Sequence, residues 1–145
     1  MTLIKRTALV GYSQRQMFEL VNLIEDYPRF LPWCRESHII AKDENQIEAS
    51  LDIAWSGIHK QFTTRNILYP FNRIDIRLVN GPFKHLQGNW IFTQAGPNGC
   101  KVDLELEFEF AGHFFDKIFQ GVFNKIANEL VDLFCKRAVE IYGTH

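Results

Sequence analysis

Histidine and cysteine are the residue types in this sequence best able to bind a metal or attack a substrate. The histidines are His38, His59, His85, His113 and His145, and the cysteines are Cys34, Cys100 and Cys135. No two histidines have a metal-ligand spacing such as H-E-x-x-H, and no glycine-rich phosphate loop is present. Three cysteines without a C-x-x-C pair indicate reduced thiols, and Cys34 is expected to be a small buried apolar side chain instead of a nucleophile. The sequence therefore predicts no metal site.

Acid–base catalysis on a buried ligand would need a titratable side chain that points into the interior. On the clearest predicted strands, carboxylates such as Asp52 and Asp75 share the phase of the polar residues and are expected to face outward. The pattern leaves the phase of the strand Lys60–Leu68 open, so His59 and Asn66 remain candidates for interior polar groups. We therefore expect no catalytic residues and a non-enzymatic protein.

The composition is that of one soluble globular domain spanning residues 1–145. Apolar residues make up 46% of the chain and charged residues 23%, both ordinary for such a domain. Thirteen Phe and three Trp favour an aromatic core or an aromatic-lined pocket. A net charge of −1 gives no overall case for nucleic-acid binding, and we expect no DNA partner. The sequence lacks an apolar run long enough for a signal peptide or membrane span, so we expect a cytoplasmic protein with at most transient membrane contact.

The longest predicted element is an amphipathic helix from Phe114 to Tyr142. Its apolar residues recur at steps of three and four, on a face formed by Phe115, Phe119, Val122, Ile126, Leu130 and Leu133. Asp116 in the first turn matches the helix dipole, as do Lys136 and Arg137 near the end. Such a helix would be about 43 Å long. A rod of this length with a broad apolar face needs a large concave partner.

A sheet can supply that partner, because the period of the sequence changes from 3.6 to 2 after residue 35. The predicted strands are Leu3–Val10, His38–Lys42, Ile47–Trp55, Lys60–Leu68, Ile74–Leu78, Leu86–Phe92 and Val102–Phe110. Two short helices follow the first strand: one opens at Ser13 with Gln16 completing a capping box, and the other has Pro28 in its first turn. Short turns make the sheet antiparallel, and its covered face must wrap around the long helix. The predicted fold is therefore an α+β helix-grip.

Two sequence blocks carry a resemblance to a known family. The first is Y-P-R-F-L-P-W-C at residues 27–34, and the second is N-G-P-F-K at residues 80–84 followed by Leu86, Trp90 and Phe92. In combination they resemble the coenzyme Q-binding START-like family of polyketide cyclase and lipid transport proteins, most closely its ribosome association toxin branch. The resemblance covers essentially the whole chain.

This resemblance implies a START-like fold that holds a lipid or quinone between sheet and helix. We expect a carrier for a hydrophobic ligand, with ubiquinone the expected one, that supports respiration and requires no cofactor. The alternative is a toxin that binds the large ribosomal subunit and blocks subunit association and translation initiation. The expected cavity lining is Phe30, Leu31, Trp33, Trp55, Leu78, Phe83, Leu86, Trp90, Phe92, Phe108, Phe115, Phe119, Val122, Ile126 and Leu130.

Each of these features also has a plainer interpretation. The apolar stripe of the long helix and the tryptophans can be ordinary core, since apolar residues at helical spacing usually indicate burial. Arg73, Arg77 and Lys84 can form a basic surface for ribosomal RNA. With Asp75 among them, they can equally be part of a dispersed charged surface. The sequence leaves these alternatives open.

Overall fold

The computed structural model of the chain describes residues 2–55, 57–111 and 117–143. Its elements are, in order, β1 (Thr2–Val10), α1 (Gln14–Asn22), the 3-10 helix η1 (Ile24–Arg29), β2 (Cys34–Lys42), β3 (Gln46–Trp55), β4 (Ile58–Tyr69), β5 (Arg73–Asn80), β6 (Phe83–Ala95), β7 (Gly99–Phe110) and α2 (Lys117–Tyr142). This order confirms the predicted α+β helix-grip fold. The predicted start of the long helix, with Phe115 and Asp116, lies outside the described residues. β2 begins at Cys34 instead of His38, because Cys34 already pairs with Ile53 on β3.

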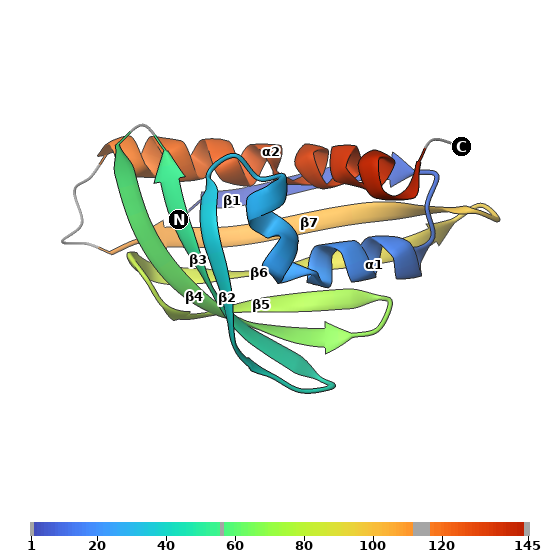
Figure 1. Cartoon of the computed structure of the whole chain (residues 1–145), viewed down its shortest axis with the longest axis horizontal. Coiled ribbons are helices and arrows are strands. Elements are labelled where there is room, and N and C mark those ends of the chain that lie inside the picture. Colours follow the sequence, from blue (N-terminus) through green and yellow to red (C-terminus); the bar gives the residue numbers. More distant parts are fainter. Residues whose placement is uncertain (1, 56, 112–116, 144–145) are drawn as a thin grey trace.

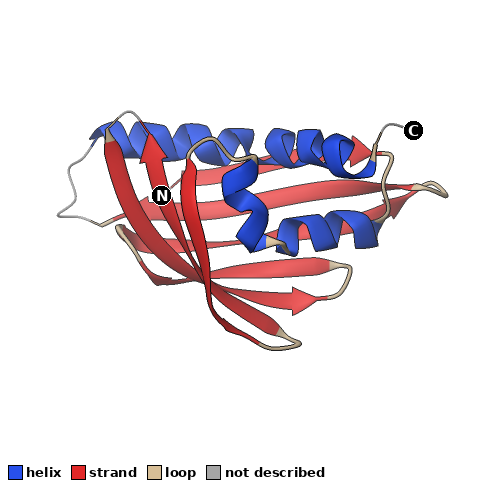
Figure 2. Ribbon diagram, viewed as in Figure 1, coloured by secondary structure: helices blue, strands red, loops and turns tan. Residues whose placement is uncertain are grey.

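The seven strands form one antiparallel sheet in the order β1-β7-β6-β5-β4-β3-β2. The first strand of the chain pairs with the last, so that Ile4 lies opposite Leu106. β1, β7 and β6 run nearly along α2, whereas β2, β3 and β4 cross its direction steeply (Figure 1). This strong twist makes the face of the sheet toward α2 concave, and α2 lies along it (Figure 2).

α1 and η1 lie beside α2 on the same side of the sheet (Figure 1). The capping box at the start of α1 is confirmed: the Gln16 N–H donates to Ser13 Oγ at 3.1 Å, and the Ser13 N–H donates to Gln16 Oε1 at 2.8 Å. The ring of Phe18 packs on β6 with its centre 5.9 Å from that of Phe92. The Tyr142 hydroxyl donates to the Gln16 carbonyl at 2.9 Å, which ties the end of α2 to α1.

α2 faces the sheet with a stripe that is rotated from the predicted one. Its buried residues are Phe119, Phe123, Ile126, Ala127, Val131, Phe134 and Ala138. Val122 and Leu133, which the spacing put on this face, are only partly buried. A helix with 3.6 residues per turn can present either of two adjacent stripes. The rings of Phe123 and Phe134 bury more apolar surface than the smaller side chains beside them, so they take the inner positions.

Phenylalanine rings fill one end of the groove between α2 and the sheet. The ring centre of Phe123 lies 4.8 Å from those of Phe83 on β6 and Phe108 on β7. One turn earlier, the ring of Phe119 packs edge-on against Phe110 at 5.8 Å. Edge-to-face and tilted contacts at these distances are favourable. This phenylalanine cluster is solid core, so any cavity must lie further along α2.

Gly88 allows β6 to run very close to β7, and Gly88→Ala tests how closely these two strands must pack. A Cβ at this position would lie 2.3 Å from the Glu105 carbonyl oxygen and 3.0 Å from Cδ1 of Leu106. The strands would have to separate, so we expect the free energy of unfolding to fall by about 1–3 kcal/mol in urea denaturation. Gly121→Ala on α2 is the control, since nothing lies within 4 Å of the added methyl group and alanine should stabilise the helix by about 1 kcal/mol. Unchanged stability of Gly88→Ala would show that the two strands separate freely.

Candidate functional site

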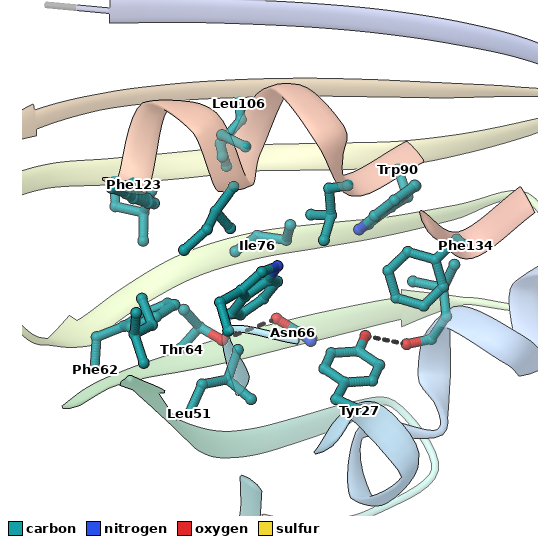
Figure 3. A pocket seen from close by; sticks show the side chains of 17 residues that line it. Tyr27, Leu51, Phe62, Thr64, Asn66, Ile76, Trp90, Leu106, Phe123 and Phe134 are labelled. Atoms are coloured by element: carbon teal, nitrogen blue, oxygen red, sulfur yellow. Dashed lines mark hydrogen bonds between the residues drawn. The ribbon is translucent and has the colours of Figure 1, made fainter. Parts of the chain in front are cut away.

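A cavity of about 100 Å³ lies between α2 and the sheet, beyond the phenylalanine cluster. Figure 3 shows the side chains around it. Its lining is Val21, Tyr27, Trp33, Leu51, Ile53, Phe62, Thr64, Asn66, Ile76, Leu86, Trp90, Leu106, Phe123, Ile126, Ala127, Leu130 and Phe134. Most of these side chains are aliphatic or aromatic hydrocarbon. Such a lining is typical of pockets that bind small apolar molecules.

The cavity exists because α2 does not follow the whole sheet. The helix backbone approaches the sheet most closely along β1 and β7. β4 reaches the helix through long side chains such as Phe62, whose ring centre lies 6.1 Å from that of Phe123. Further along the helix, Ile126 and Ala127 face the sheet, and Ala127 offers only a methyl group to fill the space. The gap therefore stays open where the inward side chains of α2 are short.

Several of the residues expected to line a cavity are in its wall: Trp33, Leu86, Trp90, Ile126 and Leu130. Others on the same inner face lie elsewhere. Phe83, Phe108 and Phe119 belong to the phenylalanine cluster. Phe92 packs under α1 against Phe18. These residues lie on the inner face but not in the lining of this cavity, since large rings close the groove at their positions.

Trp55 and Val122, also expected in the lining, border a small groove on the outside of the molecule. This outer groove is lined by Pro32, Trp33, Trp55, Val122, Lys125, Ile126 and Glu129. The Trp55 side chain is 37% exposed, and Lys125 Nζ lies 5.6 Å from its ring centre. Trp55 is the last residue of β3, so the strand carries it to the rim of the sheet instead of under α2.

The remaining expected lining residues also lie outside the cavity. Phe30 and Leu31 line a second surface groove beside the later part of α2, and the Arg137 guanidinium lies 5.1 Å from the Phe30 ring centre. Leu78 packs partly buried against the core without reaching the cavity. Phe115 is among the residues not described. Alternation along a strand shows which face a residue is on, but it does not show how far along that face a cavity extends.

β4 supplies the lining residues whose phase the sequence left open. Leu51 lies opposite Phe62, and Ile47 lies opposite Asn66, so Phe62 and Asn66 share the inner face and His59 takes the outer one. Only two residues separate β3 from β4, and this short spacing was the signal, because a connection of that length fixes the register and therefore the phase. The other lining residues that the sequence prediction missed are Val21, Tyr27, Leu51, Ile53, Thr64, Ile76, Leu106, Phe123, Ala127 and Phe134.

Hydrogen-bonding groups are few in this cavity. The Thr64 hydroxyl donates to Oδ1 of Asn66 at 3.3 Å, and the Tyr27 hydroxyl donates to the carbonyl of Val21 (Figure 3). Burial raises the pKa of Tyr27, so its hydroxyl stays protonated. The indole Nε1 of Trp33 is buried and has no hydrogen-bond partner in the part of the chain that the structure describes. The cavity therefore combines an apolar wall with a small number of polar groups.

The cavity offers no group suited to proton transfer. Its lining contains no carboxylate, lysine, arginine or histidine. The imidazole of His59 lies on the outer face, with Nε2 4.0 Å from Oδ2 of Asp52. Within residues 2–55, 57–111 and 117–143, no cluster of three or more His, Cys, Asp or Glu residues could hold a metal ion. This arrangement suits binding of an apolar molecule better than acid–base chemistry on it.

The volume of the cavity limits what it can hold in this conformation. A dry apolar cavity of roughly 150 Å³ accepts benzene, whereas this one measures about 100 Å³. A substituted ring therefore needs more space than the cavity has in this conformation. Trp33 and Ile126 line both the cavity and the outer groove. Their side chains thus form the partition between the interior and the surface.

The residues predicted to face RNA lie on the outer surface of the sheet. Arg73 Nε lies 2.9 Å from Oδ1 of Asp75. The two groups form an ion pair, but the Nε–H of Arg73 makes no hydrogen bond. Arg77 Nη2 lies 3.9 Å from Oδ2 of the same carboxylate. Two guanidinium groups thus share one carboxylate, and one positive charge is left over. Lys84 is exposed at the start of β6. Arg77 also borders a groove with the glutamates of β7, so this surface carries charges of both signs.

Known proteins resemble this chain in both sequence and fold. Residues 10–135 match the sequence profile of the family described as polyketide cyclase / dehydrase and lipid transport. The ribosome association toxin RatA of Pseudomonas aeruginosa is 42% identical over 142 residues, which cover 98% of this chain and 99% of that protein. The mitochondrial coenzyme Q-binding protein COQ10 homolog B of Xenopus laevis is 24% identical over 93% of this chain and 57% of its own length.

Among solved structures, the Zhui aromatase/cyclase from Streptomyces sp. R1128 superimposes with a TM-score of 0.83. The match covers 94% of this chain and 93% of that one at 15% sequence identity, and it shows the shared fold alone. None of the helices in the described residues is long and apolar enough to cross a membrane.

The thiol of Cys34 should be unreactive in the folded protein. Burial, with a smaller contribution from Asp52, raises its pKa from 9.0 to about 12. Above about pH 9 the unfolded thiol loses its proton while the folded thiol keeps it, so the free energy of unfolding should fall between about pH 9 and pH 12. Cys34→Ala should flatten this slope in urea denaturation series. At pH 8, peptide mapping should find Cys34 unmodified by iodoacetamide unless the protein is unfolded, and rapid native alkylation would instead indicate a thiolate nucleophile.

Proposed function

The chain belongs to the polyketide cyclase / dehydrase and lipid transport family, and on this basis we propose that it is a non-enzymatic carrier for an apolar ligand. The observation that supports this function is the cavity between α2 and the sheet, whose lining is mostly hydrocarbon and contains no charged side chain. A ligand there would be removed from water by helix and sheet together. The lining contains no residue that could act as a general acid or base on it at neutral pH.

An isoprenoid quinone, ubiquinone in particular, is the ligand class we propose. Its ring would take the aromatic-walled cavity between Trp90, Phe134 and Leu106. Its tail would pass the partition of Trp33 and Ile126 into the outer groove. The name of the Xenopus relative supports this class, since that protein is described as coenzyme Q-binding. A carrier of ubiquinone would support respiration.

Ile126→Trp tests whether the ligand sits in the cavity. The larger side chain can occupy the open space, so we expect binding of a short-tailed ubiquinone to be lost while the free energy of unfolding falls by less than about 1 kcal/mol. Val131→Trp is the matched control, because Val131 is 3% exposed on the same helix and lines none of the described cavities. It should cost about 1–3 kcal/mol through overpacking.

Calorimetric titration gives the affinity for the short-tailed ubiquinone, and urea denaturation of the same samples gives the free energy of unfolding. Absence of quinone binding by the wild-type protein would refute the carrier function. Tight binding that survives in Ile126→Trp would place the ligand elsewhere.

Ribosome association is a second candidate function, and the names of the relatives favour it. The Pseudomonas protein that is 42% identical over nearly the full length is called a ribosome association toxin. We propose that the outer face of the sheet contacts ribosomal RNA of the large subunit through Arg73 and Arg77, whose side chains are 44% and 49% exposed. Asp75 neutralises only one of the two charges, so one arginine charge remains to contact phosphate beside the glutamates of β7. Binding at this surface would leave the cavity free for its ligand.

Charge reversal at this surface should weaken ribosome binding. Wild-type protein should co-sediment with large ribosomal subunits, less so as salt rises, because contacts to phosphates release counterions. Arg73→Glu with Arg77→Glu should abolish co-sedimentation and leave quinone binding unchanged. The control is Arg15→Glu with Arg29→Glu, which changes the net charge by the same amount at two exposed arginines that each pair with one carboxylate. This variant should bind large ribosomal subunits as the wild type does. A wild-type protein that stays in the supernatant at every salt concentration would exclude this function.

A further inference from the structure

The indole N–H of Trp33 is a polar group that the fold leaves without a partner. Trp33 is 5% exposed, and its Nε1 has no exposed surface and no hydrogen bond within the described chain. The backbone holds the residue in place, because the Ala54 N–H donates to the Trp33 carbonyl at 2.9 Å and the Cys34 N–H donates to the Leu31 carbonyl at 3.0 Å. The backbone is therefore fixed beside the cavity, and the Trp33 side chain forms part of the cavity wall.

An unpaired buried donor lowers stability, and native proteins rarely keep one without a reason. An indole nitrogen can only donate, so its missing partner must be an acceptor. The lining contains acceptor oxygens on Tyr27, Thr64 and Asn66, but none of them makes a hydrogen bond with the Trp33 indole. The partner that fits Trp33 is therefore an oxygen atom brought in by a ligand.

Asn66 provides a second donor in the same cavity. The Thr64 hydroxyl donates to Oδ1 of Asn66, which leaves the two N–H groups of Nδ2 unengaged by the described residues. The amide of Asn66 and the hydroxyl end of Tyr27 both point into the space beneath α2 (Figure 3). The Tyr27 proton is already donated to the Val21 carbonyl. Among the described lining residues, the protons left without an acceptor are thus those of the Trp33 and Asn66 N–H groups.

We infer that Trp33 and Asn66 form a polar subsite that selects apolar ring compounds bearing a carbonyl oxygen. This inference rests on the proposed carrier function and specifies which ligands the carrier distinguishes. A carbonyl oxygen has two lone pairs and can accept from both side chains without bringing a proton that needs its own acceptor. A carboxylate is excluded, because no cationic side chain lines the cavity to offset its desolvation. A pure hydrocarbon of equal shape leaves the indole N–H unpaired.

Two small ligands of nearly equal shape test this inference. Duroquinone has four methyl groups and two carbonyls on one ring, and durene has the four methyl groups without the carbonyls. Equilibrium dialysis should show wild-type protein binding duroquinone at least about tenfold more tightly than durene. Trp33→Phe and Asn66→Leu, each confirmed as folded by circular dichroism, should weaken duroquinone binding about threefold to tenfold and change durene binding less than about twofold.

Tyr69→Phe is the matched control, since Tyr69 is 42% exposed at the end of β4 and lines neither the cavity nor the outer groove, so the change should alter neither affinity. In NMR spectra, the indole N–H resonance that Trp33→Phe removes should move downfield with duroquinone and not with durene.

Equal losses of affinity for both ligands in Trp33→Phe and Asn66→Leu would overturn the inference, because the side chains would then contribute shape only. Equal binding of the two ligands by the wild type would overturn it as well and would leave the carrier function standing. Binding of neither ligand by the wild type would overturn both.

Discussion

The structure depends on a mismatch between a straight helix and a coiled sheet. α2 lies close to β1 and β7, which run nearly along it, whereas β3 and β4 cross its direction (Figure 1). Phenylalanine rings close one end of the space that results, and the small side chain of Ala127 leaves the middle open. A helix that followed every strand would produce a solid core. The cavity, and with it any ligand-binding function, is therefore a consequence of sheet twist and of side-chain size along one helix.

The fold by itself does not distinguish a carrier from an enzyme, because an aromatase/cyclase shares it. The proposal of a carrier therefore rests on the side chains of the cavity. Here the lining consists of hydrocarbon and a few neutral hydrogen-bonding groups, and the titratable His59 and Asp52 lie on the opposite face of the sheet. A wall of this kind can orient a ligand by its shape and by its oxygen atoms. It has no group of suitable pKa to exchange protons with that ligand.

Strand alternation also separates the two proposed functions in space. Ile76 and Arg77 are adjacent on β5, yet Ile76 lines the cavity and Arg77 lies outside beside Asp75. Successive side chains of a strand point to opposite faces, so one strand can serve a ligand inside and a partner outside. This geometry allows substitutions that change one function while the other is retained. It also means that a ligand in the cavity need not compete with a macromolecule on the outer face.

The order of elements, the antiparallel sheet and the inner face of its clearest strands follow from sequence patterns alone, because periodicity and turn residues act locally. Which stripe of α2 turns inward depends on packing between distant elements, since Phe123 and Val122 are adjacent on the helix and the strands opposite select between them. The same packing places Trp90 in the cavity wall, Phe83 in the phenylalanine cluster and Trp55 at the rim. A cavity is space left between elements, and no pattern within one element specifies where that space will be.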